Sequence, residues 1–210
     1  MIKVLIADDH DIVREGVNQI VSETSDIIVG GEARSGAEAL DLARRGGWDV
    51  IILDLNLPDR PGLDVLTQLQ GSVPVLILSM HAEASYASRA LRSGALGYVS
   101  KSSAREDLVP AIRNVARGER FLSPALAQLL AFDAMWPSRE RAHESLSARE
   151  FQILCLIAAG KPPRDIATEL NVSVKTVATH RARLLQKMGL RNNAELVQYA
   201  IEHRLLPERR

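Results

Sequence analysis

Five polar side chains with complementary chemistry end or follow short apolar runs of the sequence: Asp8, Asp9, Asp54, Ser79 and Lys101. If folding brings them together, the three carboxylates would repel one another unless a cation lies among them. Carboxylate oxygens suit Mg²⁺, which binds few protein groups and keeps several of its waters. A carboxylate nucleophile beside such an ion, with a hydroxyl and an ammonium for the phosphoryl oxygens, is what phosphoryl transfer to aspartate requires.

The apolar runs before these residues predict the elements that position them. The run Val50–Leu53 is apolar at every position, which is typical of a strand buried on both faces of a parallel sheet. Asp54 would then lie at the carboxyl end of a central strand, where open α/β sheets hold their ligands. Because strands one and three lie side by side where the strand order reverses, we expect Asp8 and Asp9 beside Asp54. His10, next in sequence, is interpreted as a surface residue.

Strand-like and helix-like segments alternate through the first part of the chain. The expected strands are Ile2–Ala7, Ile27–Gly30, Val50–Asp54, Val73–Ser79 and Gly97–Ser100. The expected helices are Asp11–Glu23, Ser35–Arg45, a segment after Pro58–Gly62 marked by Leu63, Leu66 and Leu69, then Ser85–Ser93 and Ser103–Arg117. Five β-α units in roughly 120 residues predict an α/β doubly wound, five-stranded parallel sheet.

The rest of the chain predicts a linker and a small all-α domain. Ser123-Pro124 opens a short helix through Ala134, and the following residues show little apolar periodicity, so residues 122–145 are interpreted as a linker. Further helices are expected from Ser147 to about Ala159, from Pro163 to about Leu170, over Val174–Met188 and over Asn193–His203. Two short helices, a tight turn and a longer basic helix are the parts of a helix-turn-helix.

The longest of these helices has two chemically different faces. Val177, Leu184 and Met188 share one face. The opposite side carries Lys175, Thr179, Ala182, Arg183 and Gln186, with Thr176 at its edge. A basic and hydroxyl-bearing face opposite an apolar one suits a helix that lies in the major groove of DNA. Residues 146–210 also carry 11 Lys and Arg against 6 Asp and Glu, whereas residues 1–124 carry 13 against 17. This asymmetry favours nucleic acid as a partner of the second part.

The composition excludes several classes of protein. The 210 residues contain 26 basic and 26 acidic side chains, and no apolar run approaches the ~20 residues that cross a bilayer. The chain enters its first strand without a signal-peptide pattern. Cys155 is the single cysteine, so there is no disulfide framework, and we interpret it as a core residue. These features predict a cytoplasmic protein with no membrane partner.

The first half of the sequence resembles the receiver domain of response regulators, the phosphoacceptor of two-component signalling. The resemblance is carried by Asp8-Asp9, by LDLNLPD around Asp54, by Ser79 after PVLIL, and by GYVSK with Tyr98 and Lys101. It implies that Asp54 accepts phosphate from a sensor histidine kinase and that Lys101 contacts a phosphoryl oxygen. The family often has proline after this lysine, commonly through a cis bond, whereas this chain has Ser102.

The same resemblance implies a metal site and a conformational switch. Asp9, Asp54 and the main-chain carbonyl of Asn56 would hold Mg²⁺, with Asp8 acting mostly through water. On phosphorylation, the hydroxyl of Ser79 would move toward the phosphate and the ring of Tyr98 would turn inward.

The segment LSAREFQILCLIAAGKPPRDIATELNVSVKTVATHRARLLQKMG resembles the DNA-binding domain of the NarL/FixJ (LuxR-type) response regulators. The predicted DNA contacts are Lys175, Thr176, Thr179 and Arg183, with Lys161 and Lys187 on phosphates. Such domains commonly carry lysine where Ala178 stands, so no sequence preference is inferred. The expected domains are a receiver over 1–121, a linker over 122–145 and a helix-turn-helix domain over 146–210. The implied function is phosphorylation-dependent transcription regulation by a homodimer on promoter DNA.

Two other functions are compatible with parts of the sequence. A carboxylate-based phosphatase also uses Mg²⁺ and an aspartate nucleophile, but it needs a second acid two residues later, where this chain has Asn56. We therefore expect no enzyme with an external substrate, only phosphotransfer to the chain itself and slow dephosphorylation. A DNA binder with a relic receiver is the second alternative, and the complete set of phosphorylation groups argues against it.

Some residues keep two interpretations. Arg181 could reach a DNA phosphate or support its own domain. Leu196, Tyr199 and Ala200, at helical spacing in the last helix, could form a dimer contact or pack within the domain.

Overall fold

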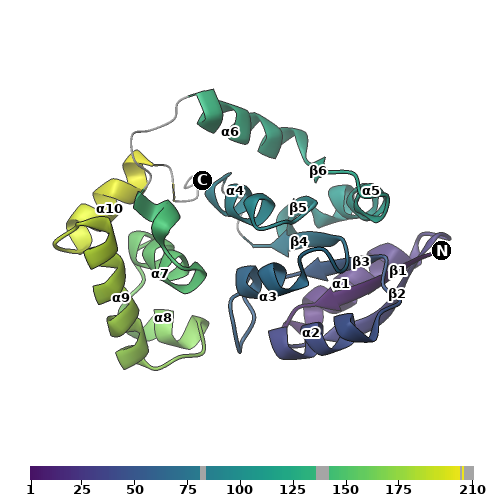
Figure 1. The fold of residues 1–210 in the computed structure, drawn as a ribbon, viewed down its shortest axis with the longest axis horizontal. Coiled ribbons are helices and arrows are strands. Elements are labelled where there is room, and N and C mark those ends of the chain that lie inside the picture. The colour runs from purple at the N-terminus through teal and green to yellow at the C-terminus, as the bar shows by residue number, and fades with distance from the viewer. Residues whose placement is uncertain (81–83, 136–141, 204, 206–210) are drawn as a thin grey trace. The chain divides into compact units, whose positions relative to one another are not determined.

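The structure of the chain is a computed structural model that describes residues 1–80, 84–135, 142–203 and 205. The chain forms two compact units, Met1–Ala131 and Phe132–Arg210. The first unit is an α/β sheet domain and the second is helical (Figure 1). Residues 136–141, which belong to the predicted linker, lie outside the described residues. No helix among the described residues has the length and apolar character to cross a membrane.

The first unit contains the predicted parallel sheet. Its strands are β1 (Ile2–Ala7), β2 (Ile27–Ala33), β3 (Val50–Leu53), β4 (Val75–Ser79), β5 (Gly97–Ser100) and β6 (Phe121–Leu122). They lie in the order β2-β1-β3-β4-β5-β6, with every pair parallel. The doubly wound fold is therefore confirmed. The two-residue β6, which pairs with Gly97 and Tyr98 at the sheet edge, was not predicted because it is too short to show a periodic pattern.

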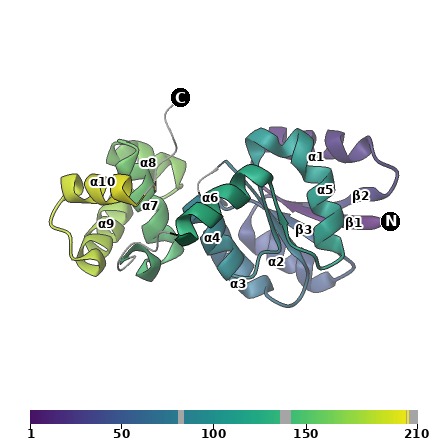
Figure 2. The ribbon, with the colours of Figure 1, turned by 90° about the horizontal axis from the view of Figure 1, so that it is seen from above.

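Helices cover both faces of this sheet. They are α1 (Asp11–Ser22), α2 (Gly36–Arg45), α3 (Gly62–Leu69), α4 (Ala84–Arg92) and α5 (Ala104–Ala116). Helices α1 and α5 lie on one face, and α2 to α4 lie on the other (Figure 2). Each helix returns the chain so that the next strand runs parallel to the last.

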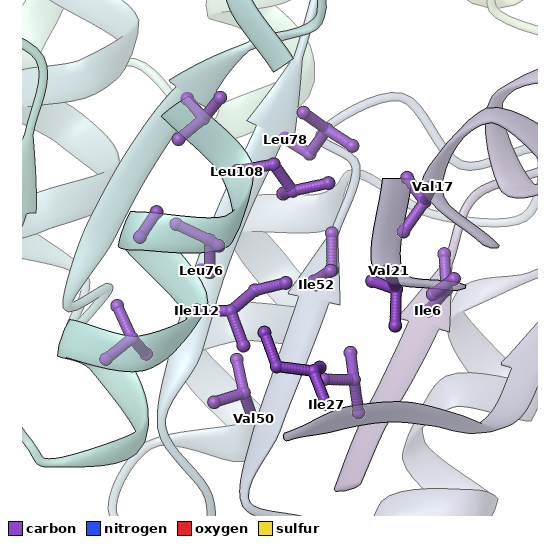
Figure 3. Close-up of a cluster of buried hydrophobic side chains, with 14 residues drawn as sticks. Ile6, Val17, Val21, Ile27, Val50, Ile52, Leu76, Leu78, Leu108 and Ile112 are labelled. Atoms are coloured by element: carbon purple, nitrogen blue, oxygen red, sulfur yellow. The ribbon is translucent and has the colours of Figure 1, made fainter. Parts of the chain in front are cut away.

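The core beneath α1 and α5 follows the two-residue alternation of the strands. Branched side chains from β1 to β5 meet the apolar stripes of both helices (Figure 3). The labelled members are Ile6, Val17, Val21, Ile27, Val50, Ile52, Leu76, Leu78, Leu108 and Ile112. All four residues of β3 are buried, as the apolar run predicts for a central parallel strand. Ile12 of α1, in contrast, is 83% exposed because the buried side of α1 runs through Arg14, Val17 and Val21.

The second unit is a bundle of short helices. They are α7 (Ala148–Ala158), α8 (Pro163–Glu169), α9 (Val174–Met188) and α10 (Asn193–Glu202), preceded by the 3-10 turn η2 (Ala142–Ser145). Helix α6 (Pro124–Met135) spans the boundary between the units. The side chains of Ser147, Ser173 and Asn192 cap α7, α9 and α10, and Gly189 ends α9 in a left-handed conformation. The predicted all-α domain is confirmed.

Candidate functional site

The carboxyl ends of β1, β3 and β5 bring two carboxylates and one ammonium together. The Nζ atom of Lys101 lies 2.8 Å from Oδ2 of Asp54 and 2.6 Å from Oδ2 of Asp8. The side chains of both aspartates are 2% exposed, and that of Lys101 is 8% exposed. The predicted neighbours therefore meet, and the lysine holds the two buried carboxylates side by side.

Burial and charge shift the proton affinities of this cluster. Burial raises the pKa of Asp54 from 3.8 to about 6, the negative charge of Asp8 adds to the shift, and the Lys101 ammonium opposes it. Burial acts to lower the pKa of Lys101, but the two carboxylates outweigh that effect and raise it. One positive charge therefore only partly offsets two buried negative ones, and a further cation would be stabilised here.

Asp9 and His10 extend the cluster toward solvent. Nδ1 of His10 lies 2.8 Å from Oδ1 of Asp9 and 3.2 Å from Oδ1 of Asp8. Asp8, Asp9, His10 and Asp54 each offer a ligand atom, and these atoms lie within 4.8 Å of one another. Hard carboxylate oxygens at this spacing fit a divalent cation. His10 is a surface residue as expected, 62% exposed, but it contacts both members of the acidic pair.

The loop after β3 holds the main chain of Asp54 tightly. Its N–H donates to the carbonyl of Ala7 at 2.9 Å, and its Oδ1 accepts from the N–H of Leu55 at 2.7 Å. Gly62 comes so close that an added Cβ would lie 2.2 Å from the Asp54 carbonyl oxygen. Asn56 pairs with Pro61 through the main chain inside the same loop. The loop is therefore closed around the predicted phosphoacceptor.

Ser79 is the last residue of β4, and Tyr98 is the second residue of β5. Both are buried, with exposed fractions of 0% and 1%. Tyr98 therefore lies in the interior of the first unit, and its role in a switch stays a prediction. The 3-10 turn Lys101–Ser103 lies where the family often has a proline-containing loop, and the Oγ of Ser100 accepts from the N–H of Ser102 at 3.3 Å. The Lys101–Ser102 peptide bond is trans.

Helix α9 presents the predicted DNA-contact face to solvent. Lys175, Thr179 and Arg183 are exposed and Thr176 is half-buried, whereas Val177 and Leu184 are buried. Among the described residues, none forms a hydrogen bond or ion pair with the charged ends of Lys175 and Arg183. The opposite faces that the sequence predicts are therefore present, and two cations remain available to a polyanion.

Three other basic residues of this unit have partners within it. Lys187 lies 2.7 Å from Oε2 of Glu150, the buried capping residue of α7, and Lys161 pairs with Glu169. Nε of Arg181 donates to Oδ1 of Asn193 at 2.6 Å. The contact of Arg181 agrees with a supporting role, and the phosphate contacts of Lys161 and Lys187 stay predictions.

The residues with two interpretations in α10 pack inside their own unit. Leu196 and Ala200 are fully buried, and the hydroxyl of Tyr199 lies 2.8 Å from Nδ1 of His143 in η2. The Tyr199 ring also stacks on His203 at a centroid distance of 4.0 Å. These contacts favour intradomain packing for all three residues.

Comparison with known proteins identifies both units. Residues 4–113 match the response regulator receiver domain, and residues 144–200 match the bacterial regulatory proteins of the luxR family. Response regulator UvrY of Escherichia coli (strain K12) is 35% identical over 209 residues, which cover 98% of this chain and 96% of UvrY.

Solved structures agree with this assignment. One is RcsB from Salmonella enterica serovar Typhimurium, bound to promoter P1flhDC in the presence of the phosphomimetic BeF3-. It matches with a TM-score of 0.64 at 27% identity, and the match covers 94% of this chain and 97% of the RcsB chain. Two RcsB dimers bound to two parallel DNAs give a TM-score of 0.59 at 27% identity, covering 95% and 98%. The chain thus belongs to the response regulators, and its LuxR-type DNA-binding domain makes it a NarL/FixJ-family transcription regulator.

Proposed function

We propose that the chain is a phosphorylation-dependent regulator whose phosphoacceptor is Asp54. The observation that carries this proposal is the buried Asp54 carboxylate at the carboxyl end of β3, paired with Lys101 at 2.8 Å. Its donor would be a sensor histidine kinase, the partner that a receiver domain implies. One carboxylate oxygen of Asp54 attacks the phosphorus, the O–P bond forms, and the bond to the donor's histidine nitrogen breaks.

The neighbouring residues would orient the phosphoryl group. The Lys101 ammonium contacts both Asp54 and Asp8. After phosphorylation it can bind a phosphoryl oxygen in place of the Asp54 carboxylate oxygen. The hydroxyl of Ser79 would donate to a second oxygen, and the buried Tyr98 ring would follow the movement of Ser79. No external substrate is turned over, because the acceptor is the chain itself, which loses the phosphate only slowly.

The metal that we propose for this reaction is Mg²⁺. Asp9, Asp54 and the main-chain carbonyl of Asn56 would hold it, with Asp8 acting through water. The observation in favour is the donor set, because carboxylate oxygens within 4.8 Å of one another suit a small hard cation. Bound there, Mg²⁺ would neutralise negative charge that develops on the phosphoryl oxygens.

The output would be promoter binding by a homodimer. The exposed cations and hydroxyls of α9 suit the major groove, and RcsB, a relative, is bound to promoter DNA and forms dimers on DNA. We propose Lys175, Thr176, Thr179 and Arg183 as contacts. A receiver over 1–121, a linker over 122–145 and a DNA-binding domain over 146–210 would divide these tasks in the cytoplasm, where promoter DNA lies.

A phosphorylation assay tests the proposal. The full chain is incubated with Mg²⁺ and a small phosphodonor, and the intact mass and the affinity for a promoter duplex are followed together. We expect one added phosphoryl group and tighter DNA binding, and we expect neither in Asp54→Ala. Asp41→Asn, on the exposed side of α2, is the matched control and should behave as wild type. Equal phosphate gain in wild type and Asp54→Ala would contradict the proposal.

A further inference from the structure

Arg14, near the start of α1, is a buried cation with a specific task. Its side chain is 3% exposed, although arginine is almost never fully buried unless it is paired. Nη1 donates to the main-chain carbonyl of Asp8 at 2.9 Å, Nε donates to Oε2 of Glu32 at 2.8 Å, and Nη2 contacts the Asp11 carboxylate. One guanidinium therefore joins α1, the loop after β1, and β2.

The partner on β2 is itself held in place. Oε1 of Glu32 accepts from Nδ2 of Asn18 at 2.8 Å, which is one helical turn beyond Arg14. The hydrogen bond from Arg14 is the main reason that the pKa of Glu32 lies below its usual value. Glu32 is thus a charged partner of fixed orientation, and it directs the guanidinium fork toward Asp8.

The carbonyl that Arg14 holds belongs to the peptide unit between Asp8 and Asp9. Because that unit is planar, fixing the carbonyl of Asp8 also fixes the direction in which the chain enters Asp9. The Asp8 N–H is bound separately, to the carbonyl of Ala33 at 3.1 Å. Lys101 forms an ion pair with the side chain of Asp8, and among the described residues it forms no hydrogen bond or ion pair with Asp9. Arg14 is therefore placed to orient both members of the acidic pair at once.

We propose that Arg14 is a positioning residue for the divalent cation: it holds the Asp8–Asp9 peptide so that both carboxylates point into the metal site. The inference rests on the proposed function, because it concerns the same cation. Ligands of metals in proteins are commonly oriented by hydrogen-bonded groups behind them, and loss of such a group weakens metal affinity about 10- to 100-fold.

The test separates positioning from a merely structural role. In the full chain, Arg14→Met keeps the apolar stem and removes the guanidinium. Binding of Mn²⁺ is followed by the electron paramagnetic resonance signal of the free ion, and the phosphorylation rate is followed against Mg²⁺ concentration. We expect Mn²⁺ affinity about tenfold weaker and the Mg²⁺ midpoint about tenfold higher, with the rate at saturating Mg²⁺ within about threefold of wild type.

Three further variants keep the test decisive. Arg113→Met removes a more exposed arginine ion pair away from the metal site, with Asp26 at 2.8 and 2.9 Å, and should leave the metal midpoint unchanged. Arg14→Lys retains a charge but not the fork, so its midpoint should lie between those of wild type and Arg14→Met. Glu32→Gln, which keeps Arg14 and weakens its orientation, should shift the midpoint in the same direction by a smaller factor.

The outcomes are distinct. If wild type binds the ions and takes phosphate while Arg14→Met shows an unchanged midpoint, the inference is wrong and the proposed function stands. If wild type itself takes no phosphate, the proposed function fails first. If Arg14→Met does not fold, Arg14→Lys and Glu32→Gln decide, and wild-type midpoints in both would overturn the inference.

Discussion

The receiver site and the exposed face of α9 differ in how their charged side chains are buried and paired. In the receiver, Asp8, Asp54 and Lys101 are nearly excluded from water and hold one another at 2.6 to 2.8 Å. On α9, Lys175 and Arg183 extend into solvent without a described partner. A buried site gains strength from low dielectric and fixed geometry, whereas an exposed face gains from long, adaptable, salt-sensitive contacts. Substitutions in the receiver site should therefore abolish phosphorylation, whereas single substitutions on α9 should weaken DNA binding only partly.

The largest effect is expected at Lys101. Lys101→Met leaves two buried carboxylates without their ammonium and removes a donor to the phosphoryl group. We expect the phosphorylation rate with a small phosphodonor to fall by about 10²- to 10³-fold. Lys3→Met, which removes a lysine over the Trp48 ring at the other end of β1, is the control and should keep the wild-type rate. If Lys101→Met is phosphorylated at a rate near that of wild type, the receiver site is not more sensitive to substitution than α9.

A graded effect is expected at Arg183. Arg183→Ala should weaken binding to a promoter duplex by about tenfold and reduce the steepness of its salt dependence by about one phosphate contact. Fluorescence anisotropy at several salt concentrations measures both quantities. An affinity and a salt slope equal to those of wild type would exclude Arg183 from the interface.

Lys187 lies on the same helix as Arg183, but its charge is already paired with the buried Glu150. Burial acts to raise the pKa of Glu150, but Lys187 and the capping contacts to Ser147 outweigh it and lower the pKa. Lys187→Met should therefore lower the free energy of unfolding of the second unit by about 1 kcal/mol. Its effect on DNA affinity should be smaller than that of Arg183→Ala, and a larger one would show that Lys187 leaves Glu150 to bind phosphate.

Asp54 should also make the stability of the fold depend on pH. Its pKa in the fold, about 6, lies above the ordinary 3.8, so the folded state binds the proton more tightly. The stability that Asp54 contributes is therefore complete below about pH 4 and is lost as the pH rises through about 6. In metal-free buffer, urea unfolding should show Asp54→Asn gaining stability relative to wild type between about pH 4 and about pH 7. A difference that does not change with pH would contradict the assignment.

The sequence predicts the elements well where patterns are long or strongly capped. The basic helix Val174–Met188 is confirmed at both ends, because Ser173 caps it and Gly189 stops it. The buried strand β3 and the approach of Asp8 to Asp54 are likewise confirmed, since they follow from an apolar run and from the topology of parallel sheets. The predicted roles of these residues in phosphorylation stay predictions.

Tertiary contacts explain what sequence reasoning missed. Arg14 was not singled out, because a charged residue in an amphipathic helix is normally assigned to solvent. A signal was nevertheless present: Arg14 precedes Val17 and Val21 by three and seven residues and so falls on their buried stripe. Its partner Glu32 lies on another strand, and no local pattern predicts such a pairing. Strand β6 was missed for the same reason, since only its neighbour β5 defines it.

The tight approach of Gly62 to Asp54 has a consequence at the level of the gene. Every amino acid that a single-base change can introduce at a glycine codon carries a Cβ, and here that atom would lie 2.2 Å from a main-chain oxygen. Gly16 of α1, where an added Cβ meets nothing within 4 Å, has no such restriction. In a library of random point mutants selected for function, codon 62 should therefore carry only synonymous changes. Codon 16 should tolerate amino-acid replacements.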